Sequence, residues 1–203
     1  MNWLRHHWFD LAPFLAVIIL IGLYVFQIQG LSLLLWINMV ALLFHQFEEY
    51  RYPGYFPGML NVVMYRSKFP DRFPLNAQTS FIVNVLIGWT TYLLAALYGS
   101  YLLWLAIAAI LISAGNVIAH CFLFNLKGNT FYNPGQLTSI LLFIPISIFF
   151  FYFLITRNLG STFDYFFGIS LGVLLNVVGI LKTIDWMKDE YSSYPFEQRQ
   201  LLQ

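Results

Sequence analysis

Charged residues are scarce in this sequence. Lys, Arg, Asp and Glu make up 9% of its 203 residues, whereas a soluble globular domain carries about 25%. By contrast 60% of the residues are hydrophobic and 20% are aromatic, and runs such as LAPFLAVIILIGLYVF (residues 11–26) contain no charge at all. This composition excludes a soluble domain and predicts an integral membrane protein with membrane lipids as its neighbours.

Cysteine and net charge exclude further classes. The only cysteine, Cys121, cannot form an internal disulfide, and its apolar surroundings predict an inert thiol. The formal net charge is +1, so we expect no nucleic-acid partner. No internal repeat and no shift of composition marks a boundary, which predicts one transmembrane domain over residues 1–203.

Six apolar segments each approach the ~20 residues that cross a bilayer as an α-helix. The predicted fold is therefore all-α, a single bundle of six transmembrane helices over residues 9–28, 31–49, 78–98, 101–124, 136–156 and 162–184. The long connection 50–77 is rich in proline and glycine, which predicts turns rather than another helix. Its aromatic residues suit the level of the lipid headgroups: Tyr50, Tyr52, Tyr55 and Phe56.

The basic residues gather on one side of this topology. Arg157 falls on one side, and the other nine fall on the side of both termini: Arg5, Arg51, Arg66, Lys68, Arg72, Lys127, Lys182, Lys188 and Arg199. By the positive-inside rule both termini are expected in the cytoplasm. The expected location is a bacterial inner membrane or an equivalent membrane.

The same topology brings polar residues to one depth. His45, Glu48 and Glu49 end the second segment, and a helix turns each glutamate only ~40–60° away from the histidine. Residues of the other segments are expected at the same end of the bundle: Asn84, Asn116, His120, Asn133, Thr138 and Asn176. We expect this layer to form one site, because ionisable residues inside a membrane are functional candidates.

Each feature also has a purely structural interpretation. Glu48 and Glu49 could pair with Arg51 at the interface, and His120 alone could be a packing residue. Asn84 and Asn176 could join helices by hydrogen bonds. The G-x-x-x-G pair Gly168 and Gly172 favours close packing within the bundle over a contact between two copies of the chain.

Three motifs in series carry a family resemblance. HQFEEY (45–50) is followed by YPGYFP, then by NVIAH (116–120), and then by YNPGQLTS (132–139) with Pro145 beyond it. In order and spacing, residues 38–150 resemble the HXXEE-motif family of integral membrane proteins. The resemblance implies the following characteristic positions but no reaction and no substrate: His45, Glu48, Glu49, Asn116, His120, Asn133 and Pro134.

A looser comparison is with intramembrane glutamate proteases, which also use paired glutamates, histidine and asparagine. This chain lacks their E-E-x-x-x-R motif, and its Asn116 precedes its His120 instead of following it. The comparison is therefore an analogy of chemistry only.

The first functional hypothesis is a membrane enzyme, hydrolytic or acid–base, that acts on a lipid or another hydrophobic molecule. Two adjacent carboxylates in a site of low dielectric constant would share a proton, and an amide of Asn84 or Asn116 would stabilise an oxyanion. The expected catalytic residues are His45, Glu48, Glu49, Asn116 and His120. The expected supporting residues are Asn84, Asn133, Pro134, Thr138 and Asn176.

A metal-dependent form of this enzyme is equally open. His45, Glu48, Glu49 and His120 could hold one zinc or iron ion with a water in an open position. A di-iron site is disfavoured, because the second E-x-x-H arm of such bundles is missing.

Two other classes stay as alternatives. A proton-coupled carrier could titrate Glu48 or Glu49, although the polar layer lies off the midplane and no inverted repeat is present. A binding or scaffold protein could use the layer only to lock the bundle. An apolar cavity that ends at the glutamates would favour the enzyme, and a water path to the opposite face would favour the carrier.

Overall fold

The computed structural model describes residues 2–201, and within them it contains helices and no strand. Six helices are long and apolar enough to cross a membrane: Trp3–Val25, Gly30–Tyr50, Ala77–Tyr98, Leu103–Gly128, Gln136–Thr156 and Thr162–Trp186. The predicted all-α bundle of six spans is confirmed. The first boundary was wrong, because the helix begins seven residues before residue 9 and carries its charged first turns beyond the apolar run.

The first two spans are uninterrupted α-helices, α1 (Asn2–Val25) and α2 (Gly30–Tyr50). Each of the other four contains a π-helical segment, in which the backbone turn is wider than in an α-helix. The third span comprises α4 (Ala77–Phe81), η2 (Ile82–Trp89) and α5 (Thr90–Tyr98), and the fourth comprises α6 (Leu103–Ile118), η3 (Ala119–Leu123) and α7 (Phe124–Gly128). The fifth comprises α8 (Gln136–Thr138), η4 (Ser139–Phe143) and α9 (Ile144–Thr156), and the sixth comprises α10 (Thr162–Leu174), η5 (Leu175–Lys182) and α11 (Thr183–Trp186).

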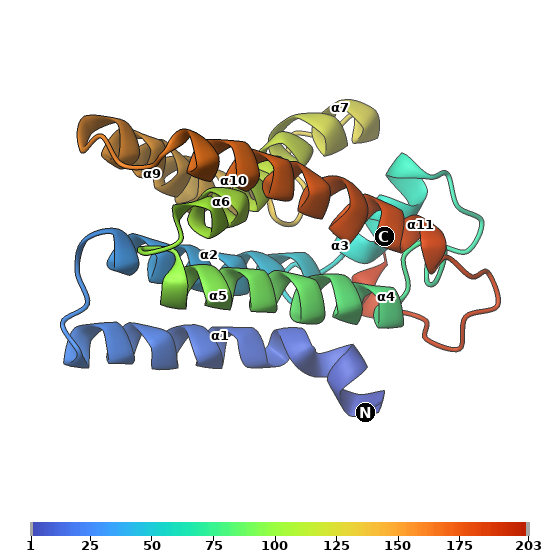
Figure 1. Cartoon of the computed structure of the whole chain (residues 1–203). Helices are drawn as coiled ribbons and strands as arrows, with labels where there is room; N and C mark the ends of the chain where they lie inside the picture. The colour runs from blue at the N-terminus through green and yellow to red at the C-terminus, as the bar shows by residue number, and fades with distance from the viewer. Residues whose placement is uncertain (1, 202–203) are drawn as a thin grey trace.

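The spans lie side by side along one axis, with α1 packed on α2, α2 on α5, and α10 along α6 (Figure 1). The spans that begin with α2 and α6 are the most deeply buried. Their inner faces form an apolar core in which Leu35, Leu43, Ile107 and Ile110 are at most 1% exposed. This core fills the half of the bundle that lies towards the short connections of residues 26–29 and 99–102.

The glycine pair of α10 packs within the bundle. A Cβ atom on Gly168 would lie 2.8 Å from the carbonyl oxygen of Trp104, and one on Gly172 would lie 2.8 Å from Cβ of Leu111. Both glycines therefore let α10 approach α6 closely, as the structural interpretation of this motif predicted.

Gly172→Leu is expected to lower the free energy of unfolding by about 1–3 kcal/mol, because overpacking forces two helices apart. Gly22→Leu, in α1, is the matched control, since no atom lies within 4 Å of its added Cβ. Unfolding in mixed detergent micelles, followed by circular dichroism, measures the difference. Equal stability of the two variants would contradict this packing.

The connection 50–77 does not match its prediction. It contains α3 (Phe56–Met59) and η1 (Leu60–Met64), which together form a short helix with most of its residues buried. Tyr50 and Phe56 are buried as well, and Tyr52 is exposed. The side chain of Asn61 explains the fold of this segment: it donates to the carbonyls of Pro70 and Leu75, both at 2.9 Å, and accepts from the Leu75 amide at 3.0 Å.

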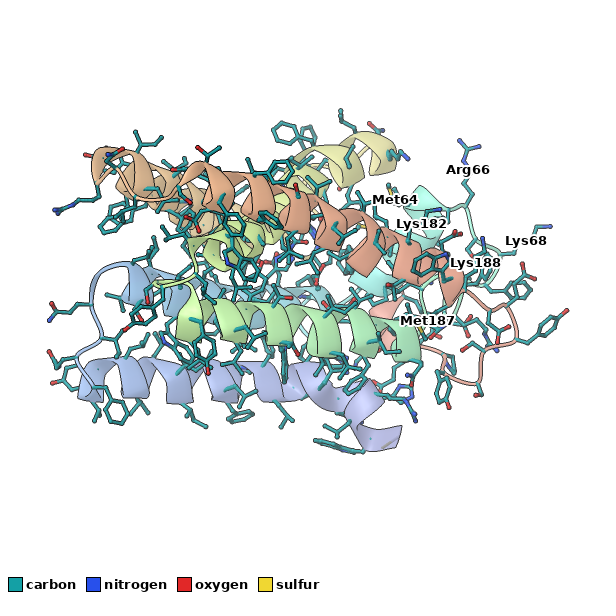
Figure 2. All side chains as sticks on the ribbon, in the orientation of Figure 1. Met64, Arg66, Lys68, Lys182, Met187 and Lys188 are labelled. Atoms are coloured by element: carbon teal, nitrogen blue, oxygen red, sulfur yellow. The ribbon has the colours of Figure 1, made fainter. Side chains whose placement is uncertain are left out.

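The basic connections share one end of the bundle. Figure 2 shows Arg66, Lys68, Lys182 and Lys188 at this end, where α4 begins and α11 ends. The short helix α3 and the first turns of α1 lie at the same end (Figure 1). Which side of the membrane this end faces stays a prediction.

Candidate functional site

Two histidines and one glutamate meet inside the bundle. The carboxylate Oε1 of Glu49 lies 3.2 Å from Nε2 of His120 and 3.6 Å from Nε2 of His45. All three side chains are buried, and their ligand-type atoms lie within 4.8 Å of one another. The two imidazole rings meet edge to face, with centroids 4.8 Å apart.

Local structure explains why these residues meet. His45 and Glu49 are four residues apart in α2, so they stack on one face of that helix. His120 lies in η3, whose wide turn begins at Ala119, directly before it. Gly135 closes the other side with a φ of +99°, and a Cβ there would lie 2.8 Å from Cε1 of His45 and would also collide with His120. A glycine is therefore required at this turn.

The outer nitrogen of His120 is held by Asn133. Its Nδ1 lies 2.7 Å from Oδ1 of Asn133, and the Asn133 amide nitrogen donates to the His120 carbonyl at 2.7 Å and to Oδ1 of Asn125 at 2.7 Å. These contacts orient the amide so that its oxygen faces the ring. Because an amide oxygen can only accept, Nδ1 of His120 carries a hydrogen, and Nε2 of the same ring faces Glu49.

Thr138 sets the same tautomer on His45. The Thr138 hydroxyl donates to Oε2 of Glu48 at 2.6 Å, with the Gly135 carbonyl at 3.2 Å as a second acceptor. The hydroxyl oxygen therefore accepts from Nδ1 of His45, 2.9 Å away. Nε2 of His45 is buried and has no hydrogen-bond partner among the described residues. The Nε2 atoms of both histidines thus face one carboxylate, and of the two only that of His45 lacks a hydrogen-bond partner.

Glu48 points away from this group. Its carboxylate accepts from the backbone amides of Leu137 and Thr138 at 3.1 and 2.8 Å, from the Thr138 hydroxyl, and from the Tyr132 hydroxyl at 2.9 Å. It therefore binds the start of the fifth span. The expectation that both glutamates share one cavity is not met, because neighbouring residues on a helix diverge by about 100°.

Tyr132 is a donor that the sequence did not reveal. Its hydroxyl lies in the loop before the fifth span, and burial together with the nearby carboxylate of Glu48 raises the pKa of the phenol. The phenol therefore keeps its proton and donates to Glu48.

Three asparagines of the expected polar layer, Asn84, Asn116 and Asn176, differ in what they bind. Asn84 donates to the Tyr50 hydroxyl at 3.1 Å and to the Ser80 carbonyl at 2.9 Å, and Asn176 donates to two backbone carbonyls of α6 and α10. Both amides are thus committed to joining helices. Asn116 is half-buried, and no described residue forms a hydrogen bond with its side chain. Of the two expected oxyanion donors, Asn116 is the one with free N–H groups.

A cavity of about 250 Å³ contains this group of residues. Its polar lining comprises His45, Gln46, Glu49, Tyr50, Tyr65, Asn84, Tyr92, Asn116, His120 and Asn176. The rest is apolar or glycine: Leu42, Phe56, Leu60, Met64, Leu75, Val83, Gly88, Ile112, Gly115, Ala119, Leu123, Phe124, Ile180, Leu181 and Ile184. Asn133, Pro134 and Thr138 stand behind the histidines instead of lining the cavity, and Pro134 is buried in the turn that ends in Gly135.

Comparison with known proteins gives a family. A family described as "Protein of unknown function with HXXEE motif" matches residues 36–150, more than half of the chain. The chain belongs to the HXXEE family. No curated protein and no solved structure matches it. The predicted resemblance over residues 38–150 is therefore confirmed.

In this structure the three defining residues of the HXXEE motif divide into two roles. The first and last, His45 and Glu49, face the cavity together with His120. The middle one, Glu48, binds the start of the fifth span and reaches His45 through Thr138. The motif thus joins two cavity-facing residues and one residue that supports them on a single turn of α2.

Proposed function

We propose that this HXXEE protein is a membrane-embedded enzyme that acts on a hydrophobic substrate with one metal ion bound to His45, Glu49 and His120. One observation carries the proposal: three buried ligand-type atoms converge, and no other donor of the described residues is directed at Nε2 of either histidine. A shared proton or a metal ion at the centre would satisfy these atoms, and the set of three ligands favours the metal. Two imidazole nitrogens and a carboxylate oxygen are the ligands of a catalytic zinc site, and imidazole also suits iron.

The distances support a metal. Ligand atoms around a tetrahedral zinc ion lie about 3.3 Å apart, given zinc bonds of about 2.0–2.1 Å. Two of the three separations match this value, since the Glu49 oxygen lies 3.2 and 3.6 Å from the two imidazole nitrogens. All three atoms lie within 4.8 Å of one another. Both histidines also donate their outer N–H to a fixed acceptor, Asn133 or Thr138, which is the usual support of a metal-binding imidazole.

The cavity supports an enzyme of hydrolytic or acid–base type. A bound zinc or iron ion would polarise a carbonyl or phosphoryl oxygen or lower the pKa of a bound water. Asn116 supplies a free amide in the same wall, four residues before His120, to donate to an oxyanion. The apolar lining would bind the hydrophobic part of the substrate and exclude water.

The cavity does not end at the glutamates as expected, because it continues past Glu49 to Leu42 and Ile112. Its closed inner end nevertheless favours an enzyme over a carrier. Its deepest lining residues are Leu42, Tyr92 and Ile112. Beyond them, Leu35, Ile107 and Ile110 are at most 1% exposed and fill the bundle. A path to the opposite face, which a proton-coupled carrier requires, would have to cross this apolar layer. The free Asn116 amide argues against a scaffold, in which every buried polar group would serve packing.

We also propose that the site faces the cytoplasm, in a bacterial inner membrane or an equivalent membrane. Nine of the ten basic residues belong to the connections and termini at this end of the bundle. The positive-inside rule assigns such an end to the cytoplasm. Cysteine labelling of Arg66→Cys and Arg157→Cys in intact cells distinguishes the two faces.

Elemental analysis of the protein purified in detergent tests the metal. The wild type is expected to hold about one equivalent of zinc or iron, and His45→Ala/His120→Ala is expected to hold none, because a single ion needs all three ligands. His6→Ala/His7→Ala is the matched control, since it removes two histidines outside the site. Its metal content should equal that of the wild type.

If the wild type holds no metal even after incubation with zinc or iron(II), the metal is excluded. His45, Glu49 and His120 would then be an acid–base group.

A further inference from the structure

The cavity reaches the surface on one flank of the bundle. Three of its lining residues are exposed, namely Tyr65, Leu123 and Leu181, at 46%, 45% and 57%. They belong to the end of η1, to η3 and to η5. The mouth therefore lies between the fourth and sixth spans, beside the short helix α3–η1. A molecule dissolved in the membrane can reach it from the side.

Basic residues lie at the end of the bundle where this mouth opens, and Figure 2 shows the side chain of Arg66 extended outward from it. Arg66 follows Tyr65 and Lys182 follows Leu181 in the chain, and Lys188 is an electrostatic neighbour of Tyr65. Figure 2 shows these three cations at the same end of the bundle as Met64, which lines the cavity. Asp185 pairs with both Lys182 and Lys188, at 3.6 and 2.7 Å. Two ammonium groups share this one carboxylate, and Arg66 is a third cation of this end, where Asp189 and Glu190 also follow Lys188 in the chain.

The three ligands lie near the mouth and not at the deep end. Along the fourth span, the cavity is lined from Ile112 to Leu123. At about 1.5 Å per residue, His120 lies roughly 4–5 Å below Leu123 and about 12 Å above Ile112 along the helix axis. The deep part is lined by Leu42, Gly88 and Ile112 and carries no charged group.

We infer that the cavity binds a single-chain amphiphile with an anionic headgroup. The apolar chain occupies the deep part, between Leu42 and Ile112. The headgroup lies at Arg66, Lys182 and Lys188. The bond next to the headgroup then faces the two histidines and Glu49, and this last step rests on the proposed function. A volume of about 250 Å³ holds roughly eight groups of the ~30 Å³ size of a water molecule, which suits the inner part of one chain and not of two. The remaining carbons of a longer chain would lie at the mouth.

The positive-inside rule gives a competing reason for cations at this end, because it requires them whatever the cavity binds. The two explanations differ in position. A basic residue that only sets the membrane orientation can lie anywhere at this end of the bundle, whereas a basic residue that binds a headgroup must lie at the mouth of the cavity. Arg51 lies at the same end of the bundle but away from the mouth, because it pairs with Asp10 of α1 at 2.8 Å.

Equilibrium binding of matched probes to the full chain, purified in nonionic detergent, tests the inference. Dodecyl phosphate and dodecanol share a chain and differ in the headgroup. Dodecyl phosphate is expected to bind at least about tenfold more tightly, the factor that one charge-assisted contact supplies. Arg66→Gln/Lys182→Gln should remove this advantage and leave the affinity for dodecanol unchanged. Arg51→Gln should change neither affinity.

Chain length tests the deep part separately. A Cβ on Gly88 has only ordinary contacts, the nearest at 3.4 Å, so Gly88→Leu fits the helix and its side chain fills the cavity. This variant is expected to lose affinity for dodecyl phosphate and to keep its affinity for hexyl phosphate. Inorganic phosphate is the third probe, because a free anion could use the same cations.

Three outcomes would overturn the inference. The first is equal affinity for dodecanol and dodecyl phosphate. The second is an equal loss in Arg51→Gln and Arg66→Gln/Lys182→Gln. The third is competition by inorganic phosphate as strong as that by dodecyl phosphate, which would show a site for a free anion. None of these measurements needs turnover or metal. Amphiphile binding can therefore be observed even if the protein holds no metal. The binding inference and the metal proposal can each fail without the other.

Discussion

Glu49→Gln is expected to abolish metal binding and leave the fold intact. Glu49 supplies the one carboxylate of the group, and its Oε1 faces the Nε2 atoms of both histidines. A neutral amide removes the negative charge that a divalent cation needs. The loss of metal affinity should therefore exceed the ~10–100-fold change that is typical when a residue hydrogen-bonded to a metal ligand is replaced.

Glu48→Gln is the matched variant one residue away, and a different result is expected. Its carboxylate accepts four hydrogen bonds, and a neutral amide weakens all of them. Because hydrogen bonds to a charged group contribute about 1.5–3 kcal/mol, we expect unfolding free energy to fall by about 2–3 kcal/mol. Metal affinity should fall only about tenfold, because Glu48 acts on His45 through the hydroxyl of Thr138.

Unfolding in mixed micelles and metal titration by isothermal calorimetry measure the two effects on the same protein samples. If both glutamine variants lose metal to the same extent with equal stability, the two carboxylates share one site. That result would restore the paired-carboxylate hypothesis and contradict the division of the HXXEE motif.

The six spans could be predicted from composition, because a bilayer requires about 20 apolar residues in succession. The buried helix of the 50–77 connection could not. Its prolines and glycines are typical of turns, and the contact that folds the segment inward is the side chain of Asn61 on Pro70 and Leu75. A contact between residues nine and fourteen positions apart leaves no periodic signal in the sequence.

The convergence of His45, Glu49 and His120 could be predicted from the sequence, since the topology places the ends of the second and fourth spans at one depth. The direction of Glu48 was not. Its donors are backbone amides of residues 137 and 138 and a tyrosine hydroxyl, all more than 80 positions away. Helical period shows that the two glutamates diverge but cannot show which one faces the cavity.

The π-helical segments limit such predictions further. Asn84, His120 and Asn176 lie in η2, η3 and η5. A wider turn shifts the face of every later residue relative to a period of 3.6. Depth in the membrane was therefore predictable for these side chains, whereas their partners were not. Asn84 and Asn176 prove to join helices, and Asn116, in the α-helical part of its span, keeps its amide free.

Thr138→Val is expected to weaken metal binding by about 10–100-fold, the range for a residue that orients a metal-binding histidine. The hydroxyl oxygen of Thr138 accepts from Nδ1 of His45 while its hydrogen goes to Glu48. Valine has the same shape and neither function. The His45 ring then loses the contact that keeps Nε2 free of hydrogen and directed at Glu49.

Thr138→Ser keeps the hydroxyl and should retain the affinity of the wild type, which separates this role from packing. The 15N chemical shifts of His45 in metal-free protein report the tautomer directly. They should show hydrogen on Nδ1 in the wild type and in Thr138→Ser, and a mixture of tautomers in Thr138→Val. Unchanged shifts together with weaker metal binding would mean that Thr138 acts through the backbone of the fifth span and not through His45.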